Sequence, residues 1–165
     1  LLLLVANASV MPMDHLAHKH LVTLTLDVDF RSMLVIGPTP GGHRRIAPVT
    51  GGHFSGERLN GTVLPGADWV INRSDGVMVI DVRLALRTDD SALIYLSYQG
   101  RFLAPAEAMS RFSKGELLEP EEYSLAIVAK FECGEDRYAW LNNVVAVGTG
   151  EQTATGPVYS LFEIG

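Results

Sequence analysis

The chain has 165 residues, of which 47% are hydrophobic and 19% charged, which is the composition of one folded domain with a sizeable core. Its net charge is −6, and this argues against nucleic acid as a partner because phosphate binding requires a basic face. Arg44 and Arg45 are its only adjacent basic residues, so no polybasic patch suits a membrane surface. We therefore predict a small-molecule ligand as the partner, and we leave open whether the chain forms a homo-oligomer.

Residues 1–19 read as a lead-in to the domain. The stretch "LLLLVANAS" ends with Ala6-Asn7-Ala8, a pattern suited to signal-peptide cleavage, so we expect a truncated secretory signal. The alternatives are an apolar N-terminal strand or a remnant of expression, and a protein without the signal would be cytoplasmic. Two sequons, which begin at Asn60 and Asn72, agree with a secreted glycoprotein.

Metal and disulfide chemistry have little support in the sequence. Cys133 is the single cysteine, so an internal disulfide and a paired-cysteine metal motif are both excluded, and we expect a partly buried small hydrophobic residue there. His15, His18 and His20 have a spacing that would place two imidazoles on one face of a strand. They lie in or directly after the lead-in, and we predict no metal.

From residue 20 onward, short β-branched and aromatic runs are separated by Gly, Pro, Asn and Asp, which predicts strands joined by tight turns. The stretch 20–30 reads as a strand, because apolar side chains alternate with Thr or Asp over residues 22–29. Residues 43–56 read as a broken strand, because Pro48 and the Gly51-Gly52 pair indicate an edge, a bulge or a sharp bend.

Residues 77–87 give the clearest strand signal. One face is entirely apolar, and it consists of Met78, Ile80, Val82, Leu84 and Leu86. The "TDDS" stretch at 88–91 is a turn whose Asp side chains can bond to their own backbone, and residues 92–100 return antiparallel to the first strand. The whole of 77–100 is therefore predicted to be a β-hairpin.

Residues 101–121 are the one irregular insert, with a short helix near 105–112, and we expect a lid or a pocket wall there. Three further strands are expected within 123–133, 138–151 and 156–164. Eight to ten strands with short turns predict an all-β fold for residues 20–165, either a small closed antiparallel β-barrel or a sandwich. A barrel of eight strands has an interior large enough for one small ligand.

Three stretches carry a resemblance to a known family: "TGGHFSGERLNGTVLPGADWVINRSDG", "DVRLALRTDDSALIYLSYQG" and "YAWLNNVVAVGTG". They resemble the domain of unknown function 3237 family, also called uncharacterised protein family 0311, over roughly residues 20–164. Two turns depart from the family pattern: one of two glycines before Ala67 is missing, and Ser91 stands where the family has Gly. The resemblance implies a small barrel with a calycin-like or allene-oxide-cyclase-like outline, and it implies no settled activity.

The charged face of the strand at 77–87 holds the first candidate site. Asp81 and Arg83 are two residues apart, so their side chains emerge on the same face, which we predict to line the barrel cavity. Arg83 would hold an anionic or carbonyl oxygen while Asp81 or Asp68 moves a proton. The alternatives are a solvated face for the pair and a turn-capping role for Asp68.

Aromatic and amide side chains complete the predicted site. The predicted substrate-binding residues are Trp69, Tyr95, Trp140, Asn142 and His53. Each has a plain alternative: the two tryptophans as core residues, Asn142 as part of a turn, and His53 as an exposed residue without a role. Strict alternation places Tyr95 on the polar face of its strand and Tyr98 on the apolar face.

No G-x-S-x-G, G-x-G-x-x-G, P-loop or H-E-x-x-H motif is present, so nucleotide cofactors, serine hydrolysis and zinc proteolysis are not expected. We predict an enzyme without a cofactor, an isomerase, lyase or cyclase that acts on a small, mostly apolar oxygenated molecule. The alternatives are a lipocalin-like binding protein with the same pocket, and a structural or oligomerising β domain with a solid interior.

Overall fold

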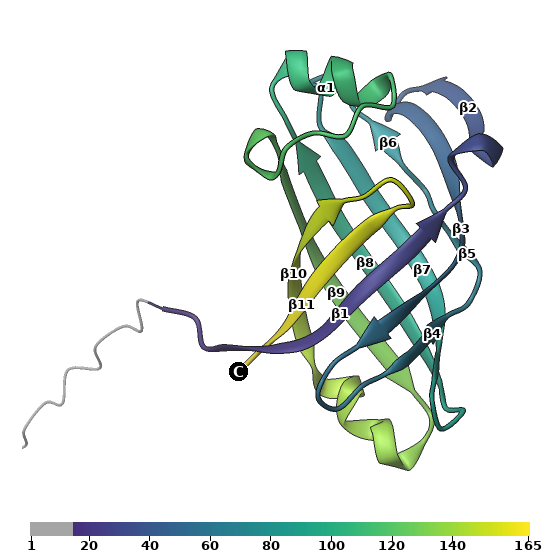
Figure 1. The fold of residues 1–165 in the computed structure, drawn as a ribbon, viewed down its shortest axis with the longest axis vertical. Helices are drawn as coiled ribbons and strands as arrows, with labels where there is room; N and C mark the ends of the chain where they lie inside the picture. The colour runs from purple at the N-terminus through teal and green to yellow at the C-terminus, as the bar shows by residue number, and fades with distance from the viewer. Residues whose placement is uncertain (1–14) are drawn as a thin grey trace, which may run out of the picture.

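The computed structural model describes residues 15–165, and in it one antiparallel sheet closes into an eight-stranded barrel (Figure 1). The elements are β1 (His18–Val28), η1 (Phe30–Ser32), β2 (Leu34–Thr39), β3 (Gly42–Ser55), β4 (Gly61–Val63), β5 (Gly66–Asp68), β6 (Ile71–Asn72), β7 (Met78–Thr88), β8 (Leu93–Leu103), α1 (Ala106–Ser113), η2 (Pro120–Glu122), β9 (Ser124–Cys133), η3 (Asp136–Asn143), β10 (Val145–Gln152) and β11 (Pro157–Ile164). The predicted all-β barrel is confirmed.

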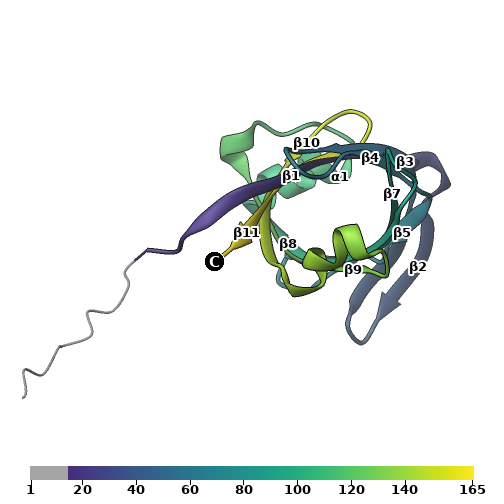
Figure 2. The same cartoon turned by 90° about the horizontal axis from the view of Figure 1, so that it is seen from below.

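The barrel closes because β1 pairs with β11 on one side and with β3 on the other. The short strands β4, β5 and β6 together fill one strand position, since each of them pairs with both β3 and β7. β2 pairs with β3 alone and forms a hairpin that projects beside the barrel (Figure 2). Closure leaves β7, β8, β9, β10 and β11 hydrogen-bonded on both sides, which removes exposed edges there.

Two-residue alternation decides which side chains fill the barrel. On β7, Ile80, Val82, Leu84 and Leu86 are buried, while the residues between them are more exposed. β9 shows the same alternation over its whole length. Full burial of each such aliphatic side chain contributes about 1.5–3 kcal/mol, so this inward apolar face is a principal source of stability.

Several local predictions are confirmed. β7 and β8 form the expected hairpin, with Leu84 opposite Leu96. α1 falls within the 101–121 insert, close to the predicted helix. Ser91 in the turn has a φ of 72°, a left-handed conformation that glycine adopts more easily. The broken strand is β3, whose register against β1 shifts near Val49, as a bulge would require.

The prediction that the charged face of β7 lines the interior is wrong. Arg83, Ala85 and Arg87 lie on the outer face and are exposed, and the apolar face points inward. Neither a helix nor another described element covers this part of the outer face. The physical reason is that closing a small barrel buries one face of every strand, and burying the apolar face is far cheaper than desolvating charges.

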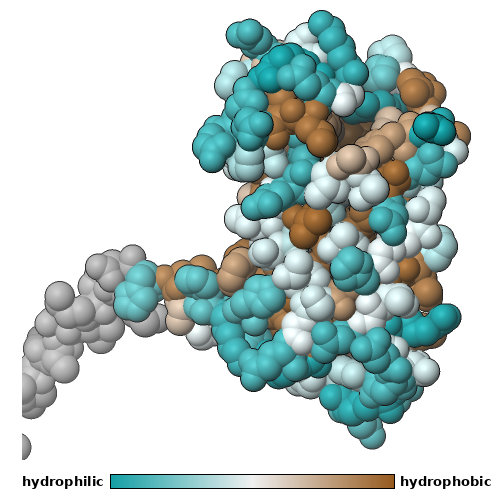
Figure 3. All heavy atoms as spheres, in the orientation of Figure 1, coloured by the Kyte–Doolittle hydropathy of each residue, from teal (hydrophilic) through white to brown (hydrophobic). Residues whose placement is uncertain are grey.

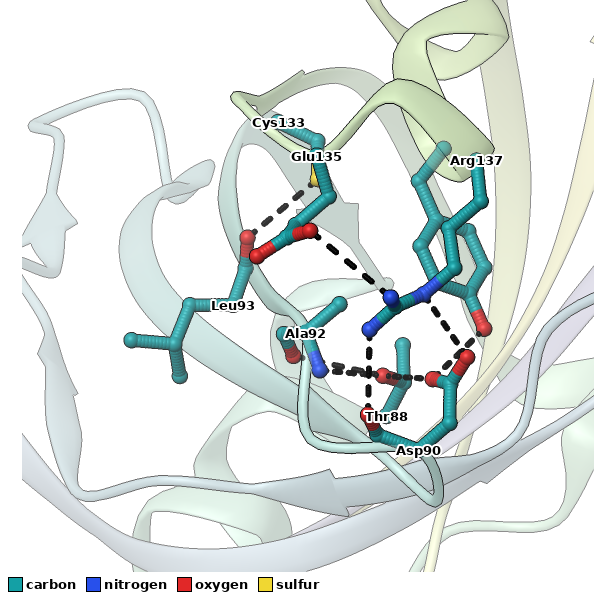
Figure 4. Close-up of polar contacts among 8 residues, drawn as sticks. Thr88, Asp90, Ala92, Leu93, Cys133, Glu135 and Arg137 are labelled. Atoms are coloured by element: carbon teal, nitrogen blue, oxygen red, sulfur yellow. Dashed lines mark hydrogen bonds and ion pairs between the residues drawn. The ribbon is translucent and has the colours of Figure 1, made fainter.

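The lower end of the barrel, drawn with η3 in Figures 1 and 2, is covered. Leu141 of η3 is fully buried, and the Arg58 guanidinium lies 4.0 Å from the centre of the Trp140 ring. Figure 4 shows how η3 is tied to the β7–β8 turn: Arg137 Nε is 2.8 Å from Asp90 Oδ2, and its Nη2 donates to the Asp90 carbonyl at 3.0 Å. The predicted turn is confirmed at residues 89 and 90, where the Asp90 side chain accepts from the Thr88 hydroxyl at 2.6 Å rather than from the backbone.

α1 and the segment that follows it lie at the upper end (Figure 1). Phe102 of β8 stacks on Phe112 of α1 at 4.9 Å and on Tyr123 at 5.0 Å, measured between ring centres. Figure 3 shows apolar atoms gathered in a recess beside α1 at this end. None of the helices formed by the described residues is long and apolar enough to cross a membrane. The predicted signal segment, residues 1–9, lies outside the described residues.

Candidate functional site

Asp68 is the one residue of the predicted site that points into the barrel. β5 lies between β3 and β7, and Asp68 is directly opposite Ala47 on one side and Val82 on the other. Both neighbours are buried on the inner face, and residues directly opposite each other in an antiparallel pair share a face. Gly66 allows this close approach, because a Cβ there would lie 2.7 Å from the Leu84 side chain and 2.8 Å from the Arg83 carbonyl oxygen.

Burial raises the pKa of the Asp68 carboxyl from 3.8 to about 7. The backbone amide of Asp81 donates to Asp68 Oδ1 at 3.1 Å and opposes this rise, and so does the positive charge of Arg45. The Asp81 carboxylate acts in the same direction as burial. A carboxyl group with a pKa near 7 is present in both protonation states at neutral pH, which is the property that a general acid or base requires.

Two tyrosines meet next to Asp68. Tyr98 is opposite Val82 on β8, so Tyr98 and Asp68 flank the same residue on the inner face. Tyr159 comes from β11, and its ring lies edge-on to the Tyr98 ring with 5.2 Å between their centres. Burial is the largest cause of the raised pKa of both phenols, and Asp68 adds to the rise, so both stay protonated at neutral pH.

Arg45 lies one inward position above Ala47, toward the upper end of β3. Its Nη2 donates to Asn72 Oδ1 at 2.5 Å, and the sulfur atoms of Met33 and Met78 lie 3.7 Å from Nη1 and 3.9 Å from Nη2. Burial lowers the pKa of the Arg45 guanidinium, although not enough to remove its charge, and Asp68 acts against this shift. We define the interior site as Arg45, Asp68, Asn72, Met78, Tyr98 and Tyr159.

The interior site retains access to solvent from the upper end. Arg45, Asp68, Asn72 and Met78 are each half-buried, although all four face inward. Further down the same face of β7, Leu84 and Leu86 are 2% and 1% exposed. The inner face is therefore solidly packed in its lower half and less completely buried in its upper half.

Asp81, Arg83 and Trp69 form a group on the outer face. Arg83 Nη2 is 3.5 Å from Asp81 Oδ2, and the Arg83 guanidinium lies 5.4 Å from the centre of the Trp69 ring. Nearly half of the Arg83 side chain is exposed, at 49%, so this is a surface ion pair of small energetic weight. The structure therefore separates the predicted pair from Asp68 by the thickness of the barrel wall.

The remaining predicted residues lie away from the interior site. His53 is exposed on the outside of β3. Trp140 lies at the lower end against Arg58, and Asn142 bonds to both backbone groups of Cys133, donating to its carbonyl at 2.9 Å and accepting from its amide at 2.8 Å. These contacts support the plain alternatives, a packed tryptophan and a structural asparagine. Cys133 is buried and free, as predicted.

Two open hollows lie on the outer surface. One, of about 600 Å³, brings together Tyr95 and Asn142 beside Cys133, and the other, of about 710 Å³, lies between α1 and η2 around Arg111 and Glu122. Both are wide open to solvent, and the Asn142 amide is already used by Cys133. The interior site is the stronger candidate, because it combines an inward-facing acid, a buried phenol and a guanidinium.

Sequence reasoning missed five residues of the interior site: Arg45, Asn72, Met78, Tyr98 and Tyr159. The signal that could have found Tyr98 was present, since alternation placed its polar tip on the apolar face of β8. Asn72 was interpreted as part of a glycosylation sequon, and in the structure its side chain faces inward, where its Oδ1 accepts from Arg45. Among residues 15–165, no group of three His, Cys, Asp or Glu side chains is placed to hold a metal ion.

The fold and the interior site define a small closed β-barrel with an ionisable group inside it. The chain belongs to the DUF3237 family, described as a protein of unknown function, whose model matches residues 17–164. A UPF0311 protein of Rhodopseudomonas palustris is 32% identical over 148 residues, which cover 88% of this chain and 95% of that protein. A UPF0311 protein of Clostridium acetobutylicum is also 32% identical, with 89% and 93% covered.

Solved structures show the same fold. A β-barrel-like protein of Acinetobacter baumannii is 34% identical with a TM-score of 0.80, and the match covers 93% of this chain and 99% of that one. A conserved protein of unknown function from Rhodopseudomonas palustris has a TM-score of 0.86 at 29% identity, with 92% and 99% covered. An enzyme from Penicillium herquei has a TM-score of 0.70 at 19% identity, with 95% and 99% covered, and this likeness shows the fold alone.

Proposed function

We propose that the protein is a cofactor-independent enzyme that moves a proton on a small, mostly apolar oxygenated molecule inside the upper half of the barrel. Many isomerisations, eliminations and cyclisations proceed through such a transfer. Asp68 is the general acid and base, and the observation that carries the proposal is its inward carboxyl group with a pKa raised to about 7. Keeping a carboxyl group in the interior is costly for stability, which favours a functional reason for its presence.

The surroundings of Asp68 suit this role. The carboxyl group is held in place by the Asp81 amide, so its proton would be delivered in a fixed direction. Phenol and guanidinium donors lie on the same inner face, and apolar side chains supply the rest of the surface. A structural neighbour from Penicillium herquei is described as an enzyme, which supports the idea that a barrel of this outline can carry catalysis.

Deuterium incorporation tests the proposal across a whole class of compounds, so the physiological substrate need not be identified first. A panel of small apolar unsaturated ketones, unsaturated alcohols and lactones is incubated with the protein in D₂O, and NMR detects deuterium appearing at carbon. We expect turnover of at least one compound by the wild-type protein, and a loss of at least about 100-fold in Asp68→Asn, as for removal of a general base. Asp75→Asn is the matched control, because Asp75 is an exposed carboxylate paired with Arg73.

The second candidate is a binding protein with no chemistry, and a specific observation favours it. The Tyr98 hydroxyl is buried and makes no hydrogen bond of ordinary geometry among the described residues, although the Tyr159 hydroxyl is near enough to raise its pKa, and a bound ligand would supply a full partner. Panel compounds that bind equally well to wild-type protein and Asp68→Asn, with no deuterium incorporation by either, would establish this function instead. A protein that neither binds nor turns over any compound would contradict both proposals.

A further inference from the structure

The hairpin formed by β2 and the start of β3 leaves one strand edge of the protein open. Each other strand formed by residues 15–165 has neighbouring strands on both sides, whereas β2 pairs with β3 alone. The hairpin projects from the barrel, so no other strand of this part of the chain reaches the second edge of β2 (Figure 2). An open edge presents backbone donors and acceptors with which a further strand can pair.

The pairing of β2 with β3 shows which backbone groups point to the open edge. Val35 is opposite Arg45 of β3, and the Arg45 amide donates to the Val70 carbonyl at 2.9 Å on the other side of β3. Because Arg45 directs its backbone groups away from β2, Val35 and Arg45 form a non-hydrogen-bonded pair, and the Val35 N–H and C=O point away from β3. Both groups are therefore available to a further strand at the open edge.

The side chains around Val35 are aliphatic and exposed. Leu34, Val35 and Ile36 are 57%, 64% and 60% exposed, so three consecutive aliphatic residues of β2 are in contact with solvent. Natural edge strands are commonly protected by charged side chains, and β2 has none. Pro38 lacks an N–H and ends the usable part of the edge, so the available surface is short. An exposed aliphatic edge of this kind is typical of a surface that pairs with another strand.

The charges of the chain indicate which partner suits this edge. Residues 30–56 contain three arginines and no Asp or Glu, so all 19 acidic residues of the chain lie elsewhere. Two copies of a chain with a net charge of −6 repel one another, and the repulsion is weakest when they meet through the segment that lacks acidic residues. The basic hairpin of one copy also approaches the acidic remainder of the other. Charge complementarity therefore favours a second copy of this chain.

A lipid surface fits the hairpin less well. The tip, residues 38–42, consists of Pro, Thr and Gly, and the aliphatic side chains lie along the strand instead. A hairpin that inserted its tip between lipid headgroups would carry large apolar side chains there.

We propose that the protein forms a two-fold symmetric dimer in which β2 of one copy pairs antiparallel with β2 of the other, centred on Val35. The N–H of Val35 donates to the C=O of the partner subunit's Val35, and the reverse bond also forms, which makes a hydrogen-bonded pair on the two-fold axis. Leu34 lies opposite Ile36 of the partner subunit, so both flanking cross-strand pairs are aliphatic. The contact uses the open edge of both copies, and assembly therefore ends at the dimer.

Sedimentation velocity at protein concentrations from the micromolar to the millimolar range tests this dimer. The contact is small for a specific interface, so we expect the wild-type protein to dimerise with a dissociation constant in the micromolar range. Val35→Pro removes the donor at the open edge without removing a hydrogen bond between β2 and β3. It should weaken the dimer by at least about 10-fold, because the two hydrogen bonds on the two-fold axis are lost.

Two charged variants test the register of the pairing. Leu34→Glu and Ile36→Lys each place a charge in both aliphatic cross-strand pairs, so each variant alone should dimerise more weakly than the wild-type protein. An equimolar mixture of the two should form a heterodimer, because position 34 of one variant then meets position 36 of the other and the two charges are opposite. This pair of variants also tests the inference if Val35→Pro does not fold.

The matched control is Val128→Lys. Val128 is 54% exposed on the outer face of β9, and β9 is paired on both sides, so this variant should leave the dimer unchanged. Wild-type protein that stays monomeric over the whole concentration range would overturn the inference. A dimer that Val128→Lys dissociates and Val35→Pro does not would also overturn it, because the outer wall of the barrel would then be the interface.

Cosedimentation with phosphatidylserine vesicles distinguishes the second copy from a lipid surface. We expect the wild-type protein to remain in the supernatant, because its net charge is −6 and its hairpin tip is not apolar. Monomeric wild-type protein that binds the vesicles, and loses this binding in Leu34→Glu, would assign the hairpin to a lipid surface and overturn the inference.

Discussion

Replacement of Asp68 by asparagine should stabilise the protein above neutral pH and have no effect in acid. Asparagine has the same shape, and its Oδ1 can still accept from the Asp81 amide, which donates to Asp68 at 3.1 Å. The variant differs chiefly in that it never has to carry a charge inside the barrel. The pKa of the Asp68 carboxyl is about 7 in the folded protein, against an ordinary value of 3.8.

The magnitude and the sign follow from proton linkage. Between these two pKa values the folded protein holds a proton that the unfolded chain has released, so the free energy of unfolding falls by about 1.4 kcal/mol per pH unit. Over the interval from 3.8 to about 7 the wild-type protein loses on the order of 4 kcal/mol relative to the variant. Below pH 3.8 the carboxyl group is protonated in both the folded protein and the unfolded chain, so no stability is lost. Above about pH 7 it is ionised in both, and the loss of stability is complete and constant.

Urea unfolding of both proteins between pH 3.5 and 8.5 measures this difference directly. Subtracting the two curves removes the contributions of all other titrating groups. Asp75→Asn is a control of opposite sign, because hydrogen bonds from Arg73 and from the Val77 amide lower the pKa of Asp75. A difference between wild-type protein and Asp68→Asn that does not change with pH, or a wild-type protein that is the more stable one at pH 8, would refute the reasoning.

Three further predictions concern the site and the fold. Any deuterium incorporation that uses Asp68 as the base should increase as pH rises through about 7, the pKa of its carboxyl group, and a rate independent of pH between 5 and 9 would contradict this role. Ser91→Gly should stabilise the β7–β8 turn by about 1 kcal/mol, seen as a higher melting temperature, because Ser91 has a φ of 72°. Leu96→Ala should cost about 2–5 kcal/mol in chemical unfolding, since Leu96 is fully buried. Leu93→Ala on the same strand is its control, and should cost far less because Leu93 is 56% exposed.

Most of the fold could be predicted from the sequence, because the alternation of apolar and polar residues and the turn residues determine the strands. Alternation of apolar side chains along 77–87 and 92–100, with a turn between them, specified the β7–β8 hairpin and its residues almost completely. Eight to ten such strands, without long helical segments, restricted the possible fold classes to a barrel or a sandwich. The helix within 101–121 was also predictable, because the alternation stops there and α1 begins directly after Pro105.

The candidate site was much harder to predict from the sequence, for reasons of geometry. A period of two shows that Asp81 and Arg83 share a face, but either face of an isolated strand could be the inner one. Closure selected the apolar face, so the most conspicuous charges ended on the surface. Trp140 and Asn142 were expected near the site, but the direction of β9 carries the chain to the opposite end of the barrel.

By itself, the sequence determined strands, turns and the sharing of faces, because these depend on residues close together in the chain. Only the tertiary structure decided that Asp68, at the end of the three-residue strand β5, would point inward between β3 and β7. It also decided that Tyr98 and Tyr159, from two other strands, would meet next to it. The raised pKa of Asp68 follows from that assembly, because desolvation depends on every strand that encloses the carboxyl group.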